Sequence, residues 1–439
     1  MNTEERGTKQ AVKFSEALRF WVRLGFINFG GPAGQIAIMH SELVDKRRWI
    51  SEEQYLRALN FCMILPGPEA QQLATYVGWR LHGFWGGVVA GSFFVIPSIF
   101  VMIGLSWLAV AQTEVPAISW MFYGIQPVVL GIVAEAIIRI GRRSLRHRVM
   151  ATFPIAAFIA IFFLSVPFPL VIAGAALGGL ALHRFRPEVF APAGHGAEAQ
   201  PHTGGRIEVV YPPFTRALRV GAVFLLLWAV PVGGLWLWRG GSDVLVQEAL
   251  FFTQSAFITI GGAYAVLSYI ADVAVNSYGW LDTGQMVQGL GLAESTPGPL
   301  IMVTQYVGFL GAWRLHGAFD PLLYGVLGSL ITTYVTFLPS FLFIFAGAPY
   351  IEALAGNRRL QAALAGVTAA IVGVILNLAV YFSSHVLFPS NGGMDIYALV
   401  TAMLSFILLW RFHLPIHLIV PAGAITGLVW SLLTKGVGL

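Results

Sequence analysis

Long apolar stretches with few or no charged side chains limit most strongly what this chain can fold into. Four of them, at about 84–110, 117–138, 318–346 and 360–383, are long enough to cross a bilayer, and 215–238 makes a fifth. Only 11% of the residues are charged, whereas a soluble domain carries roughly 25%. Soluble enzymes, disordered chains and secreted disulfide scaffolds are therefore excluded. Because the stretches are continuous and do not alternate, we predict an all-α polytopic membrane protein.

The remaining apolar runs and one polar segment divide the chain into two halves. Runs at about 150–166, 168–182, 394–411 and 413–433 are shorter and are predicted as helical pairs. A stretch rich in proline, glycine and polar residues reads as a cytoplasmic linker. The predicted organisation is an N-terminal repeat at 1–183, this linker at 184–213, an additional transmembrane span at 214–242 and a C-terminal repeat at 243–439.

The two halves share landmarks in the same order, which indicates an internal repeat. The matches are Gly30-Gly31 with Gly261-Gly262, Trp49 with Trp280, Pro66-Gly67-Pro68 with Pro297-Gly298-Pro299, Tyr76-Val77-Gly78 with Tyr306-Val307-Gly308, the Arg-Leu-His-Gly sequences that begin at Arg80 and Arg314, and Pro97-Ser98 with Pro339-Ser340. The first three pairs have the same spacing, which argues against chance reuse of glycine and proline. Internal repeats are common in secondary transporters.

Charge indicates that the two copies have opposite orientations in the membrane. Loops 45–57 and 139–148 are rich in Lys and Arg, and their counterparts at 276–288 and 384–394 contain none. In a third pair of loops the basic residues lie in the second copy instead of the first. Loop 111–117 has no basic residue, whereas its counterpart carries Arg358 and Arg359. Short basic loops stay in the cytoplasm. We therefore predict inverted-topology repeats, with the linker and the additional span supplying the odd crossing.

Each half has two interrupted segments, and we expect a substrate or ion site at their interruptions. They break at the double glycines and at the Pro-Gly-Pro sequences. Pro-Gly-Pro cannot continue a helix, because its two prolines lack N–H donors and restrict the residue before each of them. Non-helical backbone at membrane depth is tolerated inside protein or beside a wet cavity. Each break therefore predicts two half-helices that meet at an interior cavity, as re-entrant or discontinuous helices. The half-helix after each break points free N–H groups at that cavity and favours an anion. The alternative is a set of packing kinks.

Small and polar residues around the breaks are the candidate substrate ligands. In the first half they are Gly30, Gly31, Pro32, Gln35, Asn60, Pro66, Gly67, Pro68, Gln71, Gln72, Tyr76 and Arg80, and in the second half they are Gly261, Gly262, Ser295, Thr296, Pro297, Gly298, Pro299, Gln305, Tyr306 and Arg314. Such groups can replace the hydration shell of an anion. For the two arginines, the alternative is a side chain that snorkels from a helix end to the membrane surface.

Four residues are candidates for coupling transport to protons: Glu69, Glu294, His40 and Glu135. Glu69 follows the first Pro-Gly-Pro, where a neighbouring dianion favours its protonated form. The alternative is a carboxylate that only stabilises a helix start, worth roughly 0.3–1 kcal/mol. For Glu135 the alternative to a proton-coupling role is an ion pair with Arg139. For His40 the alternative is a hydrogen bond that helps packing.

Motifs of other functional classes are missing from the sequence. There is no His-Glu-x-x-His, no Gly-x-Ser-x-Gly and no nucleotide-binding Gly-x4-Gly-Lys-Ser/Thr sequence. Cys62 is the single cysteine, which excludes an internal disulfide and a multi-cysteine metal site. We therefore expect no enzyme, no cofactor, no metal and no nucleic-acid partner. A passive anion channel is the closest rival to a transporter, because broken helices serve channels as well.

At residues 29–83, which begin FGGPAGQIAIMH and include MILPGPEAQQLATYVGWRLHG, the chain resembles the chromate ion transporter family. STPGPLIMVTQYVGFLGAW at 295–313 is similar to the family's C-terminal repeat, so the chain resembles the long-chain form with two fused repeats. The resemblance implies export of chromate across the inner (plasma) membrane and chromate resistance. Sulfate or another oxyanion remains an alternative substrate, since chromate and sulfate are tetrahedral dianions of similar size. The expected partners are this oxyanion and the lipid bilayer, and a homodimer stays open.

Overall fold

The computed structural model describes residues 12–111, 115–190, 214–351, 357–389 and 393–435, and every regular element within them is a helix. Seven helices are long and apolar enough to cross a membrane: Glu69–Val110, Pro116–Ser144, Phe168–Phe185, Thr215–Arg239, Pro321–Tyr350, Arg358–Val386 and Ile416–Thr434. The prediction of an all-α multi-pass membrane protein is confirmed. Most of the predicted linker, residues 191–213, lies outside the described residues.

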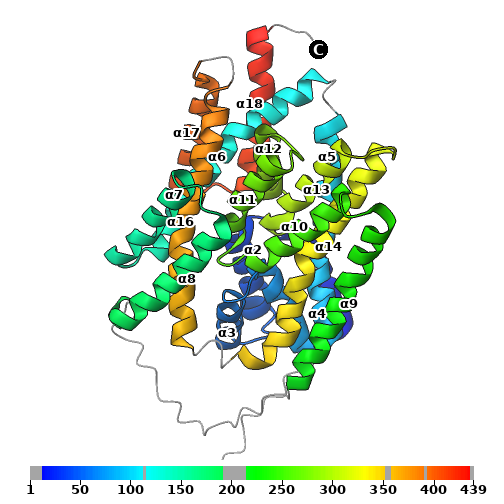
Figure 1. Cartoon of the computed structure of the whole chain (residues 1–439), viewed down its shortest axis with the longest axis vertical. Helices are drawn as coiled ribbons and strands as arrows, with labels where there is room; N and C mark the ends of the chain where they lie inside the picture. The colour runs from blue at the N-terminus through cyan, green and yellow to red at the C-terminus, as the bar shows by residue number, and fades with distance from the viewer. Residues whose placement is uncertain (1–11, 112–114, 191–213, 352–356, 390–392, 436–439) are drawn as a thin grey trace, which may run out of the picture.

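The helices of the two halves follow one another in the same order (Figure 1). In the first half they are α1 (Phe14–Ile27), α2 (Gly31–His40), η1 (Ser41–Lys46), α3 (Glu52–Cys62), α4 (Glu69–Phe93), α5 (Ile96–Ala111), α6 (Pro116–Ser144), η2 (Arg148–Ala151), α7 (Thr152–Phe162), α8 (Phe168–Phe185) and η3 (Pro187–Phe190). After α9 (Phe214–Arg239) the second half has α10 (Val244–Ile258), α11 (Ala263–Asp272), η4 (Val273–Ser277), α12 (Thr283–Ser295), η5 (Leu300–Met302), α13 (Val303–Arg314), α14 (Pro321–Gly347), η6 (Ala348–Tyr350), α16 (Arg358–Val386), α17 (Ile396–Phe412) and α18 (Ile416–Lys435).

Local details of corresponding helices agree as well. α2 and α11 each continue into a π-helical turn, η1 and η4. α3 and α12 both begin with a capping box, formed by Ser51 with Gln54 and by Asp282 with Gln285. α6 and α16 are both 29 residues long. The sequence matches are therefore accompanied by matching local structure.

Contacts bring the ends of several broken segments together. In the first half, Arg47 Nη1 lies 3.7 Å from Glu16 Oε1, so the end of η1 returns to the start of α1. His82 Nε2, at the end of the half-helix that starts α4, lies 2.7 Å from the carbonyl oxygen of Val12. In the second half, Arg314 Nη1 donates to Gly279 O at 3.1 Å, which joins the end of α13 to the η4–α12 loop. In these segments the two ends therefore lie close together, as in a hairpin.

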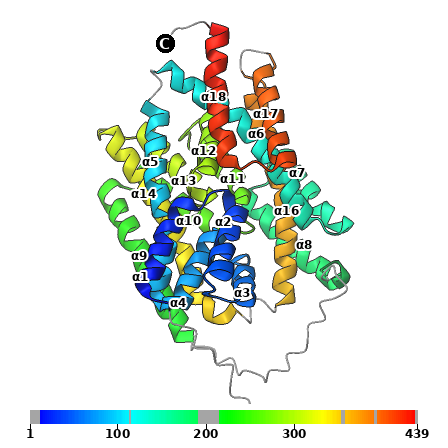
Figure 2. The ribbon, with the colours of Figure 1, turned by 180° about the vertical axis from the view of Figure 1, so that it is seen from behind.

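The long helix of each half packs against the last two helices of the other half. α6 contacts α17 and α18, and α16 contacts α7 and α8 (Figure 1, Figure 2). Glycines allow backbone-to-backbone contact at these crossings. A Cβ on Gly124 of α6 would lie 2.1 Å from Gly423 O, and one on Gly366 of α16 would lie 2.4 Å from Ala175 O. The two halves are therefore interlocked.

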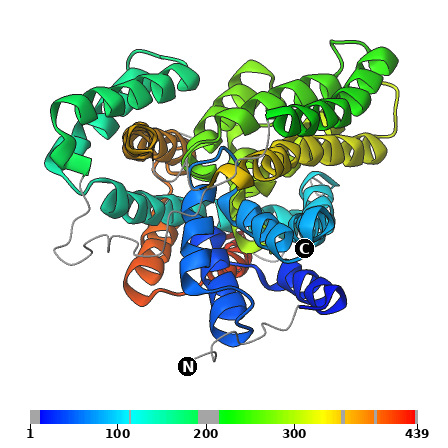
Figure 3. The same ribbon diagram turned by 90° about the horizontal axis from the view of Figure 1, so that it is seen from below.

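The edges of the protein are apolar and exposed, as a lipid-facing surface requires. α9 packs on α14, while the α7–α8 pair packs on α16 at the far side of the molecule (Figure 3). Only 11% of the apolar window of α9 is buried, with Leu218, Leu225 and Leu237 among its exposed side chains. Such a helix is stable in lipid, because its backbone bonds are all internal.

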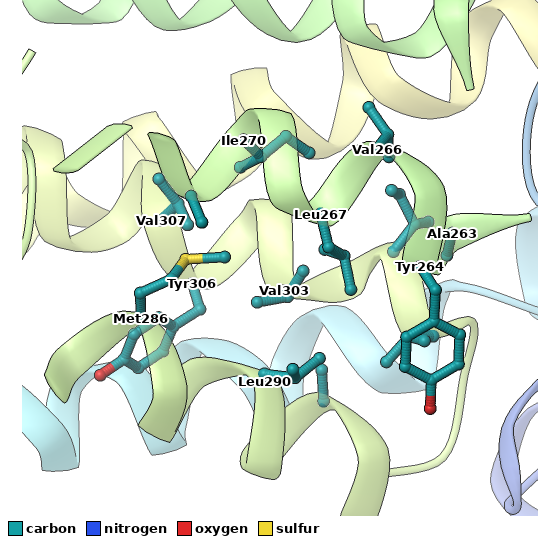
Figure 4. Close-up of a cluster of buried hydrophobic side chains, with 14 of the residues drawn as sticks. Ala263, Tyr264, Val266, Leu267, Ile270, Met286, Leu290, Val303, Tyr306 and Val307 are labelled. Carbon is teal, nitrogen blue, oxygen red and sulfur yellow. The ribbon is translucent and has the colours of Figure 1, made fainter. Parts of the chain in front are cut away.

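The second half supplies most of the tightly packed interior. α11, α12 and α13 bring apolar side chains together, and Figure 4 shows Leu267 and Ile270 beside Leu290, Val303 and Val307. These helices are short, so this packing rather than their length holds them in place. The start of α11 and the start of η5–α13 are thereby fixed in space, and the candidate site includes both.

The predicted run 84–110 lies within a candidate span, but two turn residues divide it. α4 extends to Phe93 and α5 starts at Ile96. Pro97 lacks an N–H group, so it cannot donate to the residue one turn earlier. The corresponding α14 continues through Pro339 without an interruption. α4 itself is kinked at His82 and Gly83, which are non-helical.

Candidate functional site

All four breaks meet at one small interior cavity. It is lined by the residues that follow each break: Pro32 and Gln35, Pro68 with Glu69 and Ala70, Gly262 and Ala263, and Pro299 with Leu300 and Ile301. α2, α4, α11 and η5–α13 begin here. Four helix starts thus point their free N–H groups and the positive ends of their dipoles at one place. A negatively charged ligand suits such a place.

The cavity is almost closed in this structure. Its volume is about 10 Å³, which is room for about one water molecule. A tetrahedral oxyanion is larger than that. Binding one here requires the helix starts to move apart.

Each Pro-Gly-Pro sequence is hydrogen-bonded to the first break of the other half. Gly67 N–H donates to Thr259 O at 2.8 Å, and Gly298 N–H donates to Asn28 O at 3.3 Å. Both glycines have positive φ, +118° and +114°, which a residue with a side chain rarely adopts. The geometry of the site therefore depends on both halves at once.

Matched serines hold the same two loops. Ser98 Oγ donates to Pro297 O at 2.6 Å, and a Cβ on Gly298 would lie 2.1 Å from Ser98 Oγ. In the other half, a Cβ on Gly67 would lie 2.6 Å from Ser340 Oγ. Each Pro-Gly-Pro loop thus lies against the serine of the opposite half, and only glycine fits between.

Buried glutamines position the loops and keep acceptor groups free. Gln35 Nε2 donates to Asn28 O at 2.9 Å and to Gly298 O at 2.5 Å. Gln72 Nε2 donates to Pro66 O at 2.6 Å. The Oε1 atoms of both side chains have no hydrogen-bond partner. Unpartnered polar atoms in such a place indicate water or a ligand when the site is occupied.

Two carboxylates lie close to the double glycines of the other half. Glu69 Oε1 is 3.8 Å from the position of a Cβ on Gly262, and Glu294 Oε2 is 3.7 Å from that on Gly31. Tyr264 donates its hydroxyl hydrogen to Glu294. Glu69 has no corresponding tyrosine partner and faces the cavity directly.

Other predicted residues surround this centre or lie away from it. Tyr76 and Arg80 line a second cavity of about 300 Å³ together with Gln54, Arg57 and Trp79. Gln71 donates to Thr75 Oγ1, Gln305 donates to Ile99 O, and Tyr306 is fully buried. Ser295 and Thr296 bond carbonyls of their own helix, at Leu292 and Ala293.

Four further predicted residues also lie away from the central cavity. Asn60 is exposed on α3. His40 contacts Glu52 at 2.5 Å and Asp45 at 3.4 Å near the end of η1. Glu135 pairs with Arg139 at 3.4 Å on α6. Arg314 binds Gly279 O at the rim of the second half.

Several residues of the site were missed by sequence reasoning. Asn28 and Thr259 act through their backbone carbonyls, so their side chains give no signal. Tyr264 resembles the other aromatic residues of an apolar helix. Ser98 and Ser340 did carry a signal, because Pro-Ser recurs in both halves, but the signal was read only as a landmark. Within the described ranges, no group of three His, Cys, Asp or Glu side chains could hold a metal ion.

Comparisons with known proteins place the chain in a family. The model of the chromate transporter family matches twice, at residues 15–180 and 246–428. A probable chromate transport protein of Synechococcus elongatus is 28% identical over 96% of this chain and 97% of that protein. Chromate transport proteins of Pseudomonas aeruginosa and Cupriavidus metallidurans are 30% and 26% identical, over 95% and 96% of this chain and 92% and 94% of those proteins. No solved structure matches the chain. With both family matches covering the helices that form the cavity, this chain is a multi-pass membrane protein of the chromate transporter family.

Proposed function

We propose that the protein is a secondary transporter that exports chromate from the cytoplasm across the inner membrane. The observation that carries this proposal is the convergence of four helix starts on one cavity. Oriented N–H groups attract an oxyanion without a fixed cation, so the ligand can also leave. Three relatives that align along nearly the whole chain are called chromate transport proteins.

The larger cavity gives the anion a way to the centre. Its two guanidinium groups, on Arg57 and Arg80, attract a dianion, and Arg80 makes no ion pair among the described residues. Tyr76 and Gln72 lie one and two turns before Arg80 on α4, and Glu69 begins that helix. Residues four apart share a helix face. A polar row on α4 therefore leads from this cavity to the break.

The two halves have opposite orientations in this proposal. The hairpins of the first half enter from the cytoplasm, where the basic loop with Lys46 and Arg47 stays, and those of the second half enter from outside. The shared order of helices and the reciprocal contacts of α6 and α16 support this arrangement. Binding at the centre and alternate opening of the two sides follow from such a design. The homodimer stays a prediction from the sequence.

Uptake of radioactive chromate into inverted vesicles tests the function. We expect accumulation against the chromate gradient when a pH gradient or a membrane potential is imposed. Flux only down the chromate gradient would identify a passive channel. Stronger uptake of sulfate than of chromate, measured by competition, would make sulfate the substrate.

Cysteine labelling tests the topology. Single cysteines are introduced at Arg142, Arg358, Gly279 and Gly393 after the buried Cys62 has been replaced by serine. We expect an impermeant thiol reagent to label positions 142 and 358 from the cytoplasm, and 279 and 393 from outside. Labelling of 279 and 142 from the same side would contradict the inverted arrangement.

A methyl group at the first break should block transport. Gly31→Ala places a Cβ 3.7 Å from Glu294 Oε2, next to Pro32 of the cavity lining. We expect this methyl group to narrow the space that the anion needs. Gly83 also has a positive φ, +62°, but a Cβ there meets nothing within 4 Å. Gly83→Ala is therefore a control for a methyl group at a positive-φ glycine away from the cavity. We expect chromate uptake to be lost in Gly31→Ala and kept in Gly83→Ala, at equal amounts of protein in the membrane. Equal uptake by both variants would make Gly31 an ordinary packing residue.

Glu69→Gln should remove the pH dependence of transport. A bound dianion and an ionised Glu69 repel each other across the cavity, so substrate binding and proton release are antagonistic. The glutamine is permanently neutral and of similar shape. We expect it to bind chromate at least as tightly as the native protein, with an efflux rate that no longer changes between about pH 6 and pH 8. An unchanged pH profile would leave Glu69 as a helix-start carboxylate, and Glu294→Gln, measured in parallel, would become the next variant to examine.

A further inference from the structure

A buried carboxyl group lies far from the four breaks and has no role in the site described so far. Glu248, in the second turn of α10, is fully buried. The backbone N–H of Ala312 on α13 is close to its carboxyl group, but among the described residues no side chain donates a hydrogen bond to either oxygen. Gly311 of α13 and Gly328 of α14 make room for it, since Cβ atoms there would lie 2.6 Å and 2.9 Å from its two oxygens. An ionisable group that is unpaired inside the membrane domain is costly to keep.

A row of hydroxyl groups on α14 leads from Glu248 to the central site. Thr332, Thr336 and Ser340 follow Gly328 at intervals of four residues, so all lie on one helix face. All three are buried, and none of their hydroxyl oxygens has a partner. The inner end is Ser340, whose Oγ lies against Gly67 of the Pro-Gly-Pro loop.

Hydroxyl groups in helices ordinarily bond a carbonyl of their own helix. Neighbours of this row do so: Thr333 donates to Ser329 O at 2.8 Å, and on α10 Ser255 donates to Phe251 O and Thr259 to Ser255 O. Thr332, Thr336 and Ser340 do not. Their oxygens are therefore available to other groups, and bridging waters are the usual partners of such buried oxygens.

The first half of the chain shows the same packing without these polar groups. By the sequence match, Glu248 corresponds to Ala17, Thr332 to Ala90 and Thr336 to Phe94, all of them buried. Only Ser340 has a polar counterpart, Ser98, and that one is hydrogen-bonded to Pro297. The fold therefore needs none of the three groups for packing, and a structural role does not explain them.

The outer end of the row reaches the surface through a polar cluster. Asp243, the N-cap of α10, is the described group whose charge acts on Glu248. It accepts hydrogen bonds from Arg239 of α9 at 3.0 Å and from Tyr324 of α14 at 2.7 Å. The other ionisable residues on helices around α10 are Arg216 and Arg219 of α9, Tyr264, Tyr269 and Asp272 of α11, Tyr306 and Arg314 of α13, and Asp320 and Tyr334 of α14.

We propose that Glu248, Thr332, Thr336 and Ser340 form a proton path from the outer face to the oxyanion site. This inference rests on the proposed function for its direction. Glu248 accepts a proton on one oxygen from the Asp243 side and releases one toward Thr332. Each hydroxyl, with a bridging water, accepts a proton on its oxygen and passes on its own. At Ser340 the proton reaches the Pro-Gly-Pro loop, which Glu69 directly follows. Along the row only O–H bonds form and break, and the net charge does not change.

Isosteric variants test the path in proteoliposomes. Glu248→Gln, Thr332→Val and Thr336→Val keep the shape of each side chain and remove its ability to relay a proton. Thr333→Val is the matched control, because its hydroxyl is bonded within the helix. Two rates are compared: chromate accumulation driven by a pH gradient, and exchange of labelled for unlabelled chromate at equal pH on both sides.

We expect the three path variants to lose pH-driven accumulation roughly tenfold or more while exchange stays near the native rate. Thr333→Val should keep both. Native accumulation in Thr332→Val and Thr336→Val would overturn the path, and so would loss of exchange in them, which indicates a role in packing or binding.

Infrared spectroscopy of the protein without substrate separates this proposal from the proposed function. A protonated carboxyl group gives a carbonyl band that disappears when the group ionises. Glu69 and Glu294 are also protonatable, so the bands are assigned by comparing variants. We expect one titrating band of the native protein to be missing in Glu248→Gln and to be kept in Glu69→Gln and Glu294→Gln. An unchanged set of titrating bands in Glu248→Gln would show that Glu248 does not carry the proton. If the native protein does not transport chromate but this band titrates, the proposed function is wrong. The inference that Glu248 binds and releases a proton is then still supported.

Discussion

The structure depends on one constraint, the cost of leaving backbone N–H and C=O groups unpaired away from water. Continuous helices satisfy it internally, and the chain breaks four helices at places where it can be satisfied by other means. Gly67 N–H finds the carbonyl of Thr259, and Gly298 N–H finds that of Asn28. Because each bond joins the two halves, the breaks can only be stable together. The remaining free N–H groups surround one cavity, and such a set of N–H groups favours a negatively charged ligand.

The sequence was sufficient for the parts of the site that are encoded locally. Pro-Gly-Pro and the double glycines cannot be helical, so the breaks and the starts of the following helices could be predicted. The hairpin character of the broken segments could not, because it depends on contacts such as Arg47 with Glu16 and Arg314 with Gly279. Tyr264 was missed for a similar reason. Its contact with Glu294 joins two helices, and a local sequence pattern does not predict how these helices are placed relative to each other.

The frame is nearly symmetric, while the acids within it are not. Glu69 has Leu300 as its counterpart, Glu294 has Met63, and Glu248 has Ala17. Packing contacts recur in both halves, as the pairs Gly124 with Gly423 and Gly366 with Ala175 show. Groups that recur thus build the frame, and ionisable groups that occur once make the two halves chemically different.

The interlocking of the halves has a consequence for how the chain is made. α6 leaves the ribosome long before α17 and α18, the helices that cover its glycine face. Domains made early ordinarily fold early, but here α6 has to wait in the bilayer with Gly124 and Gly131 uncovered until synthesis is nearly complete. Folding of the N-terminal half is therefore tied to the last forty or so residues of the chain. Contacts between segments so far apart in sequence form slowly. A premature stop codon before α17 would leave α6 of the N-terminal half without the two helices that it packs against.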